Sequence, residues 1–193
     1  MNIVRMALVA LVAVVAGCAT PIPDQRLPEM TFGHLAPLRL DAAAIEIVSD
    51  YRSPLLPPNI EHMFPTPPEK VARQWANDRL RPSGPSGKIR FVILNAAVTE
   101  TPITIDHGFS GAFKKEQSER YDAVLEASVE IQDASGRRRA FSSARVTRST
   151  TVREDISLAD REREWYGLVE GLVKDFDTEI EKIIRQYFAA FLR

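Results

Sequence analysis

The clearest hydrophobic pattern lies between residues 121 and 132, where apolar and polar side chains alternate with Val124 as the one exception. Tyr121, Ala123, Leu125, Ala127, Val129 and Ile131 fall on one side, and Asp122, Glu126, Ser128 and Glu130 fall on the other. This alternation predicts a strand of an antiparallel sheet with one buried and one solvated face. A turn sequence, Asp133-Ala134-Ser135-Gly136, follows. Residues 137–152 are therefore expected to return as the second strand of a hairpin.

A helical pattern covers residues 157–192. The apolar residues that recur there at spacings of three and four are Trp165, Val169, Leu172, Phe176, Ile180, Ile183, Tyr187 and Phe191. They predict one long helix with a buried stripe, capped by Ser157 with Asp160 as the capping-box acid. Gly167 and Gly171 fall on the opposite side of this helix, because each residue turns it by about 100°. Near the C-terminus the apolar arc widens through Phe188, beyond what one sheet face needs.

Three more elements are expected before the hairpin. Residues 38–51 predict a strand whose apolar phase changes near residues 42–44, which indicates a bulge, with a short helix as the alternative. Thr66-Pro67-Pro68-Glu69 predicts a helix start, with Thr66 as the cap and Glu69 completing a capping box. This helix ends at the proline- and glycine-rich residues 82–87, and residues 88–99 follow as a strand that buries Ile89, Phe91 and Ile93.

This order of elements predicts an α+β fold. We expect a four-stranded, mostly antiparallel sheet with two helices packed on one face and solvent on the other. The first two strands are joined through a helix, so that pair could be parallel.

The first twenty residues follow a different pattern from the rest of the chain. A short basic start at Met1–Arg5 precedes the unbroken apolar run Met6–Ala16, which is too short to span a bilayer and is typical of a cleaved signal. Val15-Ala16-Gly17-Cys18 resembles the lipobox that ends a bacterial lipoprotein signal peptide. The resemblance implies cleavage before Cys18, diacylglycerol on its sulfur and an acylated amino terminus. Ala19 after the cysteine, by the same resemblance, implies sorting to the outer membrane, with the protein on its periplasmic side.

The domain organisation follows from this leader. Residues 1–17 are the signal, residues 18–37 are a lipidated cysteine with a proline-rich tether, and residues 38–193 are one periplasmic domain. Prolines keep such a tether extended, at about 3 Å per residue. The alternative for Met30-Thr31-Phe32 is that they pack on the domain.

Composition excludes several classes of protein. The chain has 25 Lys and Arg against 26 Asp and Glu, and Arg5 is the only charge in the signal, so the mature part would carry a net charge of −2. This balance gives no reason to expect nucleic-acid binding. Cys18 is the only cysteine, which leaves no disulfide framework, so packing alone is expected to stabilise the domain.

Catalytic and metal-binding patterns are not found. The three histidines, His34, His62 and His107, are far apart and lack metal-ligand spacing. Gly108-Phe109-Ser110-Gly111 resembles a nucleophile elbow only in part, because Ala112 replaces the second glycine and no histidine follows. We therefore expect a protein that is not an enzyme and has no cofactor or metal, with covalent lipid on Cys18.

Three segments are candidates for contact with a partner. Residues 52–68 hold six prolines and the apolar residues Leu55, Leu56, Ile60, Met63 and Phe64, which either cover an end of the core or form a stiff exposed surface. The long loop 100–120 carries Phe109 and Phe113 between glycines, as a flexible tip or a working surface. On the last helix, Gly167, Gly171 and Phe188 are the candidates, with tolerated variation as the alternative for the glycines.

The returning strand adds an open question about charge. Residues 137–153 contain six arginines and no acid: Arg137, Arg138, Arg139, Arg145, Arg148 and Arg153. We expect them to pair across the hairpin with Asp122, Glu126 and Glu130. Binding of lipid phosphates or an anionic polymer is the alternative.

The lipobox together with the element order over residues 38–193 looks like that of small envelope lipoproteins. Those families include a lipopolysaccharide-assembly lipoprotein, auxiliary lipoproteins of lipid-transport ABC systems and activators of peptidoglycan synthases. The resemblance implies a lipid-anchored accessory module that binds an envelope protein during envelope assembly or lipid transport. Activation of a peptidoglycan synthase and direct lipid binding are the alternatives. No functional residue is carried over, because a fold does not specify a function.

Overall fold

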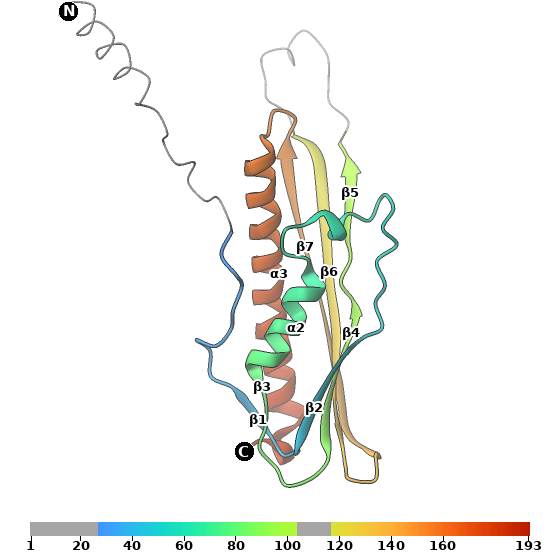
Figure 1. The fold of residues 1–193 in the computed structure, drawn as a ribbon, viewed down its shortest axis with the longest axis vertical. Coiled ribbons are helices and arrows are strands. Elements are labelled where there is room, and N and C mark those ends of the chain that lie inside the picture. The colour runs from blue at the N-terminus through green and yellow to red at the C-terminus, as the bar shows by residue number, and fades with distance from the viewer. Residues whose placement is uncertain (1–26, 104–116) are drawn as a thin grey trace, which may run out of the picture.

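The computed structural model describes residues 27–103 and 117–193, and the fold is α+β, as predicted. The main sheet has five strands: β2 (Ala44–Ser49), β4 (Lys88–Asn95), β5 (Val98–Pro102), β6 (Gln117–Gln132) and β7 (Arg138–Arg153). β2 and β4 are parallel, and the other pairs are antiparallel. β7 follows β6 along its whole length, whereas β4 and β5 share the other edge of β6 (Figure 1).

Two helices cover one face of this sheet. They are α2 (Pro68–Arg79) and α3 (Leu158–Tyr187), and α3 runs beside the long hairpin (Figure 1). Short 3-10 helices occupy Glu61–Met63 (η1) and Ala189–Phe191 (η3). With 30 residues, α3 is about 45 Å long, so it matches the length of the two 16-residue strands of the hairpin.

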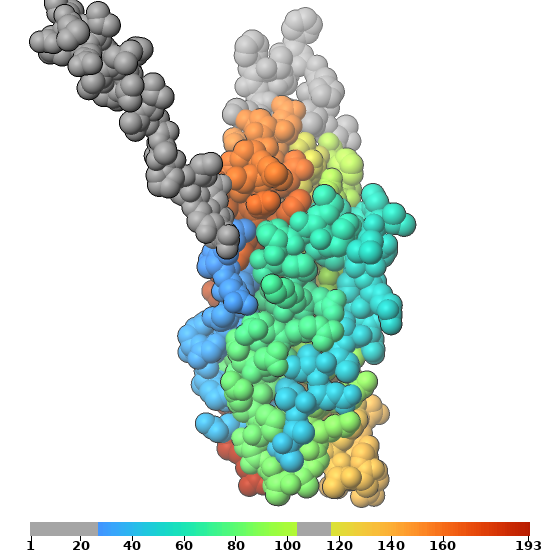
Figure 2. Space-filling model, in the orientation of Figure 1, coloured from blue at the N-terminus to red at the C-terminus, as the bar shows by residue number. Residues whose placement is uncertain are grey.

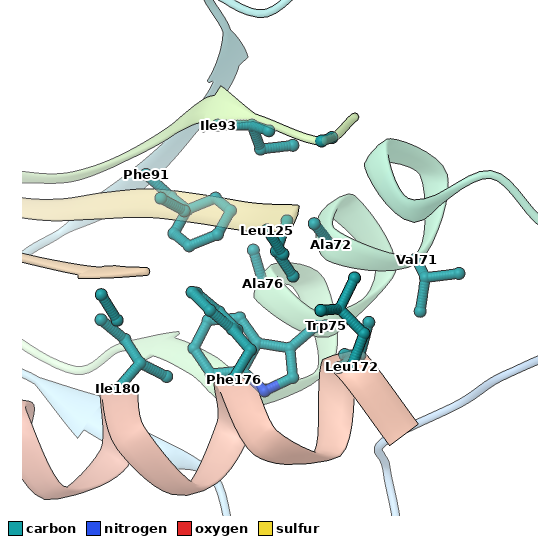
Figure 3. Packing of buried hydrophobic residues seen from close by; sticks show 14 of the residues in the cluster. Val71, Ala72, Trp75, Ala76, Phe91, Ile93, Leu125, Leu172, Phe176 and Ile180 are labelled. Carbon is teal, nitrogen blue, oxygen red and sulfur yellow. The ribbon is translucent and has the colours of Figure 1, made fainter. Parts of the chain in front are cut away.

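The core lies between the helices and the inner face of the sheet. All six inward positions expected on β6 are buried, and the rings of Trp75, Phe91 and Phe176 meet with centroids 5.2–6.4 Å apart. Phe91 therefore contacts both helices at once, which places α2 and α3 on the same face. Figure 3 shows this cluster, with Leu125 next to it and Ala72 and Ala76 giving α2 close access to the sheet.

The prediction of one continuous strand over residues 38–51 is wrong. It breaks at residues 41–43 into β1 (Leu38–Leu40) and β2, and the two pieces enter different sheets. β1 pairs in parallel with β3 (Leu80–Pro82), which follows α2 directly. The phase change in the apolar pattern therefore marks a change of sheet, and neither a bulge nor a helix lies there.

The C-terminal residues complete the small sheet and explain the wide apolar arc of the last helix. Leu192 bridges Leu40 in antiparallel fashion, the Arg193 N–H donates to Arg39 O at 3.0 Å, and Arg193 pairs with Asp41 at 2.7 Å. Beyond Ile180 the arc thus has a second layer to pack against. Tyr187, assigned to the buried stripe from the sequence, is exposed at the helix end.

The two predicted helix caps have different outcomes. At α3 the Ser157 hydroxyl accepts from Asp160 N–H at 3.1 Å, which confirms the cap. At α2 the prediction is wrong: the helix begins at Pro68, Pro67 takes the N-cap position, and no side chain caps it. Glu69 instead pairs with Arg73 one turn later at 3.0 Å. The strand expected over residues 88–99 is likewise divided, into β4 and β5.

Candidate contact surfaces

The proline-rich loop before α2 exposes three large apolar side chains. Leu55, Leu56 and Met63 are 62%, 66% and 59% exposed. The loop forms a protrusion on the surface, seen in teal in Figure 2. We call Leu55, Leu56 and Met63 the loop surface. Exposed apolar side chains that gather in one place mark contacts with a partner or a membrane.

Part of the same loop belongs to the core. Ile60 and Phe64 are buried, and the Phe64 ring stacks on Trp165 of α3 with centroids 4.6 Å apart. Phe64 was predicted as a partner-binding residue, and its burial corrects that assignment. Each of the two alternatives for this loop thus applies to some of its residues. Ile60 and Phe64 cover the core, whereas Leu55, Leu56 and Met63 face outward.

A buried carboxylate holds the loop in shape. Glu61 accepts hydrogen bonds from the Tyr51 hydroxyl at 2.6 Å, from the Ser53 hydroxyl at 2.5 Å and from the Val98 N–H at 3.1 Å. Burial alone would raise the pKa of Glu61, but these hydrogen bonds outweigh it and hold the pKa below 4.5. Glu61 is therefore ionised at neutral pH and joins three separate points of the loop and β5. The sequence offered one signal for this role, a single acid among prolines and apolar residues.

Backbone contacts add to this rigidity. Ile60 N–H donates to Val98 O at 2.9 Å, and Glu100 N–H donates to Pro58 O at 2.8 Å, so residues 58–60 run beside the edge of β5. Leu55 has a φ of 58°, in the left-handed region that favours glycine. A leucine held there costs free energy that the surrounding contacts have to offset, and such strain is concentrated at functional segments.

The N-terminal end of the described chain reaches this loop. Leu27, Pro65 and Thr66 line one groove of about 520 Å³, so the segment that leads back to Cys18 meets the body two residues from Met63. Met30 is buried, which favours packing on the domain for residues 30–32. Phe32 N–H also donates to the Asp78 carboxylate at 2.8 Å.

A buried arginine fixes the next part of this segment. Arg79 of α2 is almost fully buried, donates to the Ala36 carbonyl, and pairs with Asp177 at 2.8 Å and with Glu181, both on α3. Trp75 donates to the same Asp177 carboxylate at 2.8 Å. One cluster therefore joins the N-terminal segment to both helices. The expected free tether is consequently shorter than residues 18–37.

Contacts within the chain explain two of the three candidates on α3, Gly171 and Phe188. A Cβ on Gly171 would lie 2.4 Å from Arg148 Nε, because the Arg148 side chain crosses α3 there to reach Asp175 at 2.7 Å. Gly167 has open space around its missing Cβ. Phe188, predicted as a partner-binding residue, is fully buried and belongs to the core, which corrects that assignment.

Arginines between residues 137 and 153 pair with acids in four different places, and the pair of Arg148 with Asp175 on α3 is one of them. Arg145 pairs across the hairpin with Glu126 at 2.7 Å, as predicted. Arg137 and Arg139 instead pair with Asp133 in the turn at 3.3 and 3.7 Å. Arg153 pairs with Asp155 at 3.4 Å.

A second exposed apolar position lies near the hairpin turn. Phe141 is half exposed on the outer face of the sheet, opposite Glu130 in the register, and Arg138 lies 5.0 Å above its ring. We call Arg138 and Phe141 the hairpin surface. The partner of Phe141 on β6, Glu130, is eight positions from Asp122, which pairs with β5 beside the proline-rich loop. Eight strand positions correspond to about 27 Å.

A group of titratable side chains lies where β5 and β6 pair. The Tyr121 hydroxyl donates to Glu119 at 2.5 Å, and Arg161 of α3 pairs with the same carboxylate at 3.2 Å. Glu100 lies nearby on β5; burial, and then the negative charge of Glu119, raise the pKa of its carboxyl above 4.5.

Other expected features fall outside the residues that the structure describes. They are Cys18, Phe109 and Phe113. Within residues 27–103 and 117–193, no three His, Cys, Asp or Glu side chains gather in a way that could hold a metal ion. In the same ranges, no helix has both the length and the apolar composition needed to traverse a bilayer.

Comparison with known proteins gives a distant structural likeness. No protein-family model matches the chain, and no curated protein matches it in sequence. A 2.35 Å crystal structure of a minor lipoprotein from Acinetobacter baumannii matches 79% of this chain and 96% of its own, with 15% identity and a TM-score of 0.36. A likeness at this level supports no conclusion about function.

Proposed function

We propose that this chain is a lipid-anchored, non-enzymatic accessory module on the periplasmic side of the outer membrane. In this proposal Cys18 carries the lipid, and the body binds an envelope protein that takes part in envelope assembly or lipid transport. The lipobox residues Val15–Cys18 and the resemblance that they carry support the anchor and its location.

The observation that carries the proposal is the placement of the exposed apolar side chains. Met63 of the loop surface is two residues from the groove that the segment leading to Cys18 enters, and the hairpin surface lies about 27 Å along β6 from the point where this loop meets β5. One body can therefore make a contact close to its anchor and a second contact away from it. Aromatic and arginine side chains are enriched among the residues that dominate binding energy, so we assign the protein contact to the hairpin surface.

The proposal that the chain is not an enzyme rests on how its buried polar side chains are used. Glu61 holds the loop, and Arg79 joins the N-terminal segment to the helices. Both charged groups already have partners that account for their burial.

Two experiments test the proposal. Labelling of cells with radioactive palmitate should mark the chain and not its Cys18→Ser variant, and density-gradient separation of the membranes should place the labelled chain in the outer-membrane fraction. A photo-crosslinking amino acid at Phe141 should then give one discrete protein adduct. The matched control is the same amino acid at Ser149, which is exposed on the same strand and face. An unlabelled chain, or equal adducts from both positions, would overturn the proposal.

A further inference from the structure

We propose that the loop surface docks on the lipid bilayer that holds the anchor, and so determines which end of the body faces the membrane. This inference rests on the proposed lipid anchor at Cys18. It assigns the lipid surface to the loop and leaves the protein contact at the hairpin.

The length of chain before the structure begins places the loop near the membrane. Nine peptide steps separate Cys18 from Leu27, and they span at most about 30 Å. Leu27 and Pro65 line the same groove, and the buried Met30 and the Phe32–Asp78 hydrogen bond hold the segment on the body from residue 30 onward. Met63 of the loop surface is thus two residues from the groove at which the anchored segment meets the body.

The charge of the loop suits a lipid headgroup region. Residues 51–64 contain one carboxylate, that of Glu61, which is buried and fully engaged in hydrogen bonds. Arg52 and His62 are exposed on the same segment. Asp50, just before this segment, is exposed as well. Exposed apolar side chains beside an exposed cation suit the interface of a membrane with anionic lipids.

Three exposed side chains can provide this docking for a body that is already held at the membrane. A body that is already anchored needs little additional affinity to adopt one orientation, because its effective concentration at the membrane is high. The hydrogen bonds of Glu61 and the pairing with β5 fix the loop in advance, so docking costs little conformational entropy.

The test uses the mature lipidated chain in vesicles of phosphatidylethanolamine and phosphatidylglycerol. With its native cysteine acylated, a Met63→Cys substitution provides a single thiol for a nitroxide label. Its depth, measured by electron paramagnetic resonance with oxygen and a water-soluble nickel relaxant, should be about 5–10 Å below the headgroups. The matched control, Phe141→Cys, should remain in water, because that position lies on the hairpin surface.

A second variant separates docking from loss of structure. Leu55→Ser/Leu56→Ser removes two side chains that make no contribution to the core, so the circular dichroism spectrum should not change. The label at Met63→Cys should then return to water in the same vesicles. A label that stays at the same depth in this variant would show that the leucines do not hold the loop on the bilayer, and would overturn the inference.

The remaining outcomes distinguish this inference from the proposed function. A mass spectrum that shows an unmodified Cys18 refutes the anchor itself. A lipidated chain whose Met63→Cys label stays in water refutes the docking alone. A label that is in water in vesicles but protected in native membranes means that a protein covers the loop, which also refutes the assignment to lipid.

Discussion

The two glycines of α3 provide a sharp test of the packing between this helix and β7. Replacing glycine by alanine in a helix interior stabilises it by about 1 kcal/mol. At Gly167 nothing lies within 4 Å of the added Cβ, so Gly167→Ala should deliver that full gain. For a domain of this size, 1 kcal/mol raises the melting temperature by roughly 2–4 °C.

At Gly171 the same substitution meets Arg148. The added Cβ would lie 2.4 Å from Arg148 Nε and 2.7 Å from Cζ, so the guanidinium has to move and its 2.7 Å pair with Asp175 is lost. Both partners are about half exposed, and such a pair contributes roughly 0–1 kcal/mol. We therefore expect Gly171→Ala to stabilise by about 0.5 kcal/mol or less, because the helical gain and the lost pair nearly cancel.

A double-mutant cycle in urea measures this coupling. In an Arg148→Ala background the obstacle is gone, so Gly171→Ala should recover the full gain of about 1 kcal/mol. Gly167→Ala should behave alike in both backgrounds and serves as the control. Equal effects of Gly171→Ala with and without Arg148 would refute the argument, because they would mean that Arg148 does not cross the helix at this glycine.

Three further substitutions test the buried polar groups. Glu61→Ala should lower the free energy of unfolding in urea by roughly 2–4 kcal/mol and make residues 52–60 sensitive to protease, because three donors lose their acceptor. Since the folded-state pKa of Glu61 lies below 4.5, its contribution to stability is present above that pH and is lost as pH falls through the folded-state pKa. A difference in unfolding free energy between wild type and variant that stays constant as pH falls would contradict this. Glu100→Gln should stabilise the chain at pH 7 and have no effect well below pH 4.5, because the raised pKa of Glu100 means that its ionised form is unfavourable in the folded state. A variant that is less stable than the wild type at pH 7 would refute the raised pKa. Arg79→Met should cost roughly 3 kcal/mol and expose the segment before Leu38 to protease, and an intact segment would show that Arg79 does not hold it.

The parts of the fold that the sequence predicts correctly are the long ones with a local period. The β6–β7 hairpin and α3 bury the positions that alternation and three- and four-residue spacing select, from Tyr121 to Ile131 and from Trp165 to Ile180. Each of these patterns is repeated over many residues, so one exception does not change the assignment. Their turn and cap are also set by residues next to them, Asp133-Ala134-Ser135-Gly136 and Ser157.

The predictions that fail depend on partners far away in the sequence. Whether Leu38–Leu40 continues into β2 is decided by β3, about 40 residues later, and by Leu192 at the end of the chain. No pattern within residues 38–51 indicates that β3 or Leu192 will pair with this segment. The α2 cap fails for a different reason: with Pro67 and Pro68 side by side, one register step moves the helix start past Thr66.

The contact surfaces show the same limit. Composition shows that the loop is too apolar for a solvated one, but not that Phe64 stacks on Trp165 while Leu55 and Leu56 face outward. That division depends on the direction of the chain after Glu61, whose partner Val98 belongs to β5. Phe188 likewise belongs to the core because a second sheet lies there to receive it.

The arginines of the hairpin show how a charge count can mislead about a binding function. A segment with six arginines and no acid suggests a site for lipid phosphates, yet Arg145, Arg148 and Arg153 have carboxylate partners on β6, α3 and the segment after β7. Arg137 and Arg139 share Asp133, whose pKa is lowered to about 2 by hydrogen bonds from Ser135 and Arg137, so it stays ionised. A phosphate would have to displace these acids one by one, and each exchange of one anion for another gains little. The positive charge of β7 is therefore used mainly to bind the hairpin to its own turn and to α3, and an interaction with anionic lipid is better supported at Arg52, which lies next to exposed apolar side chains.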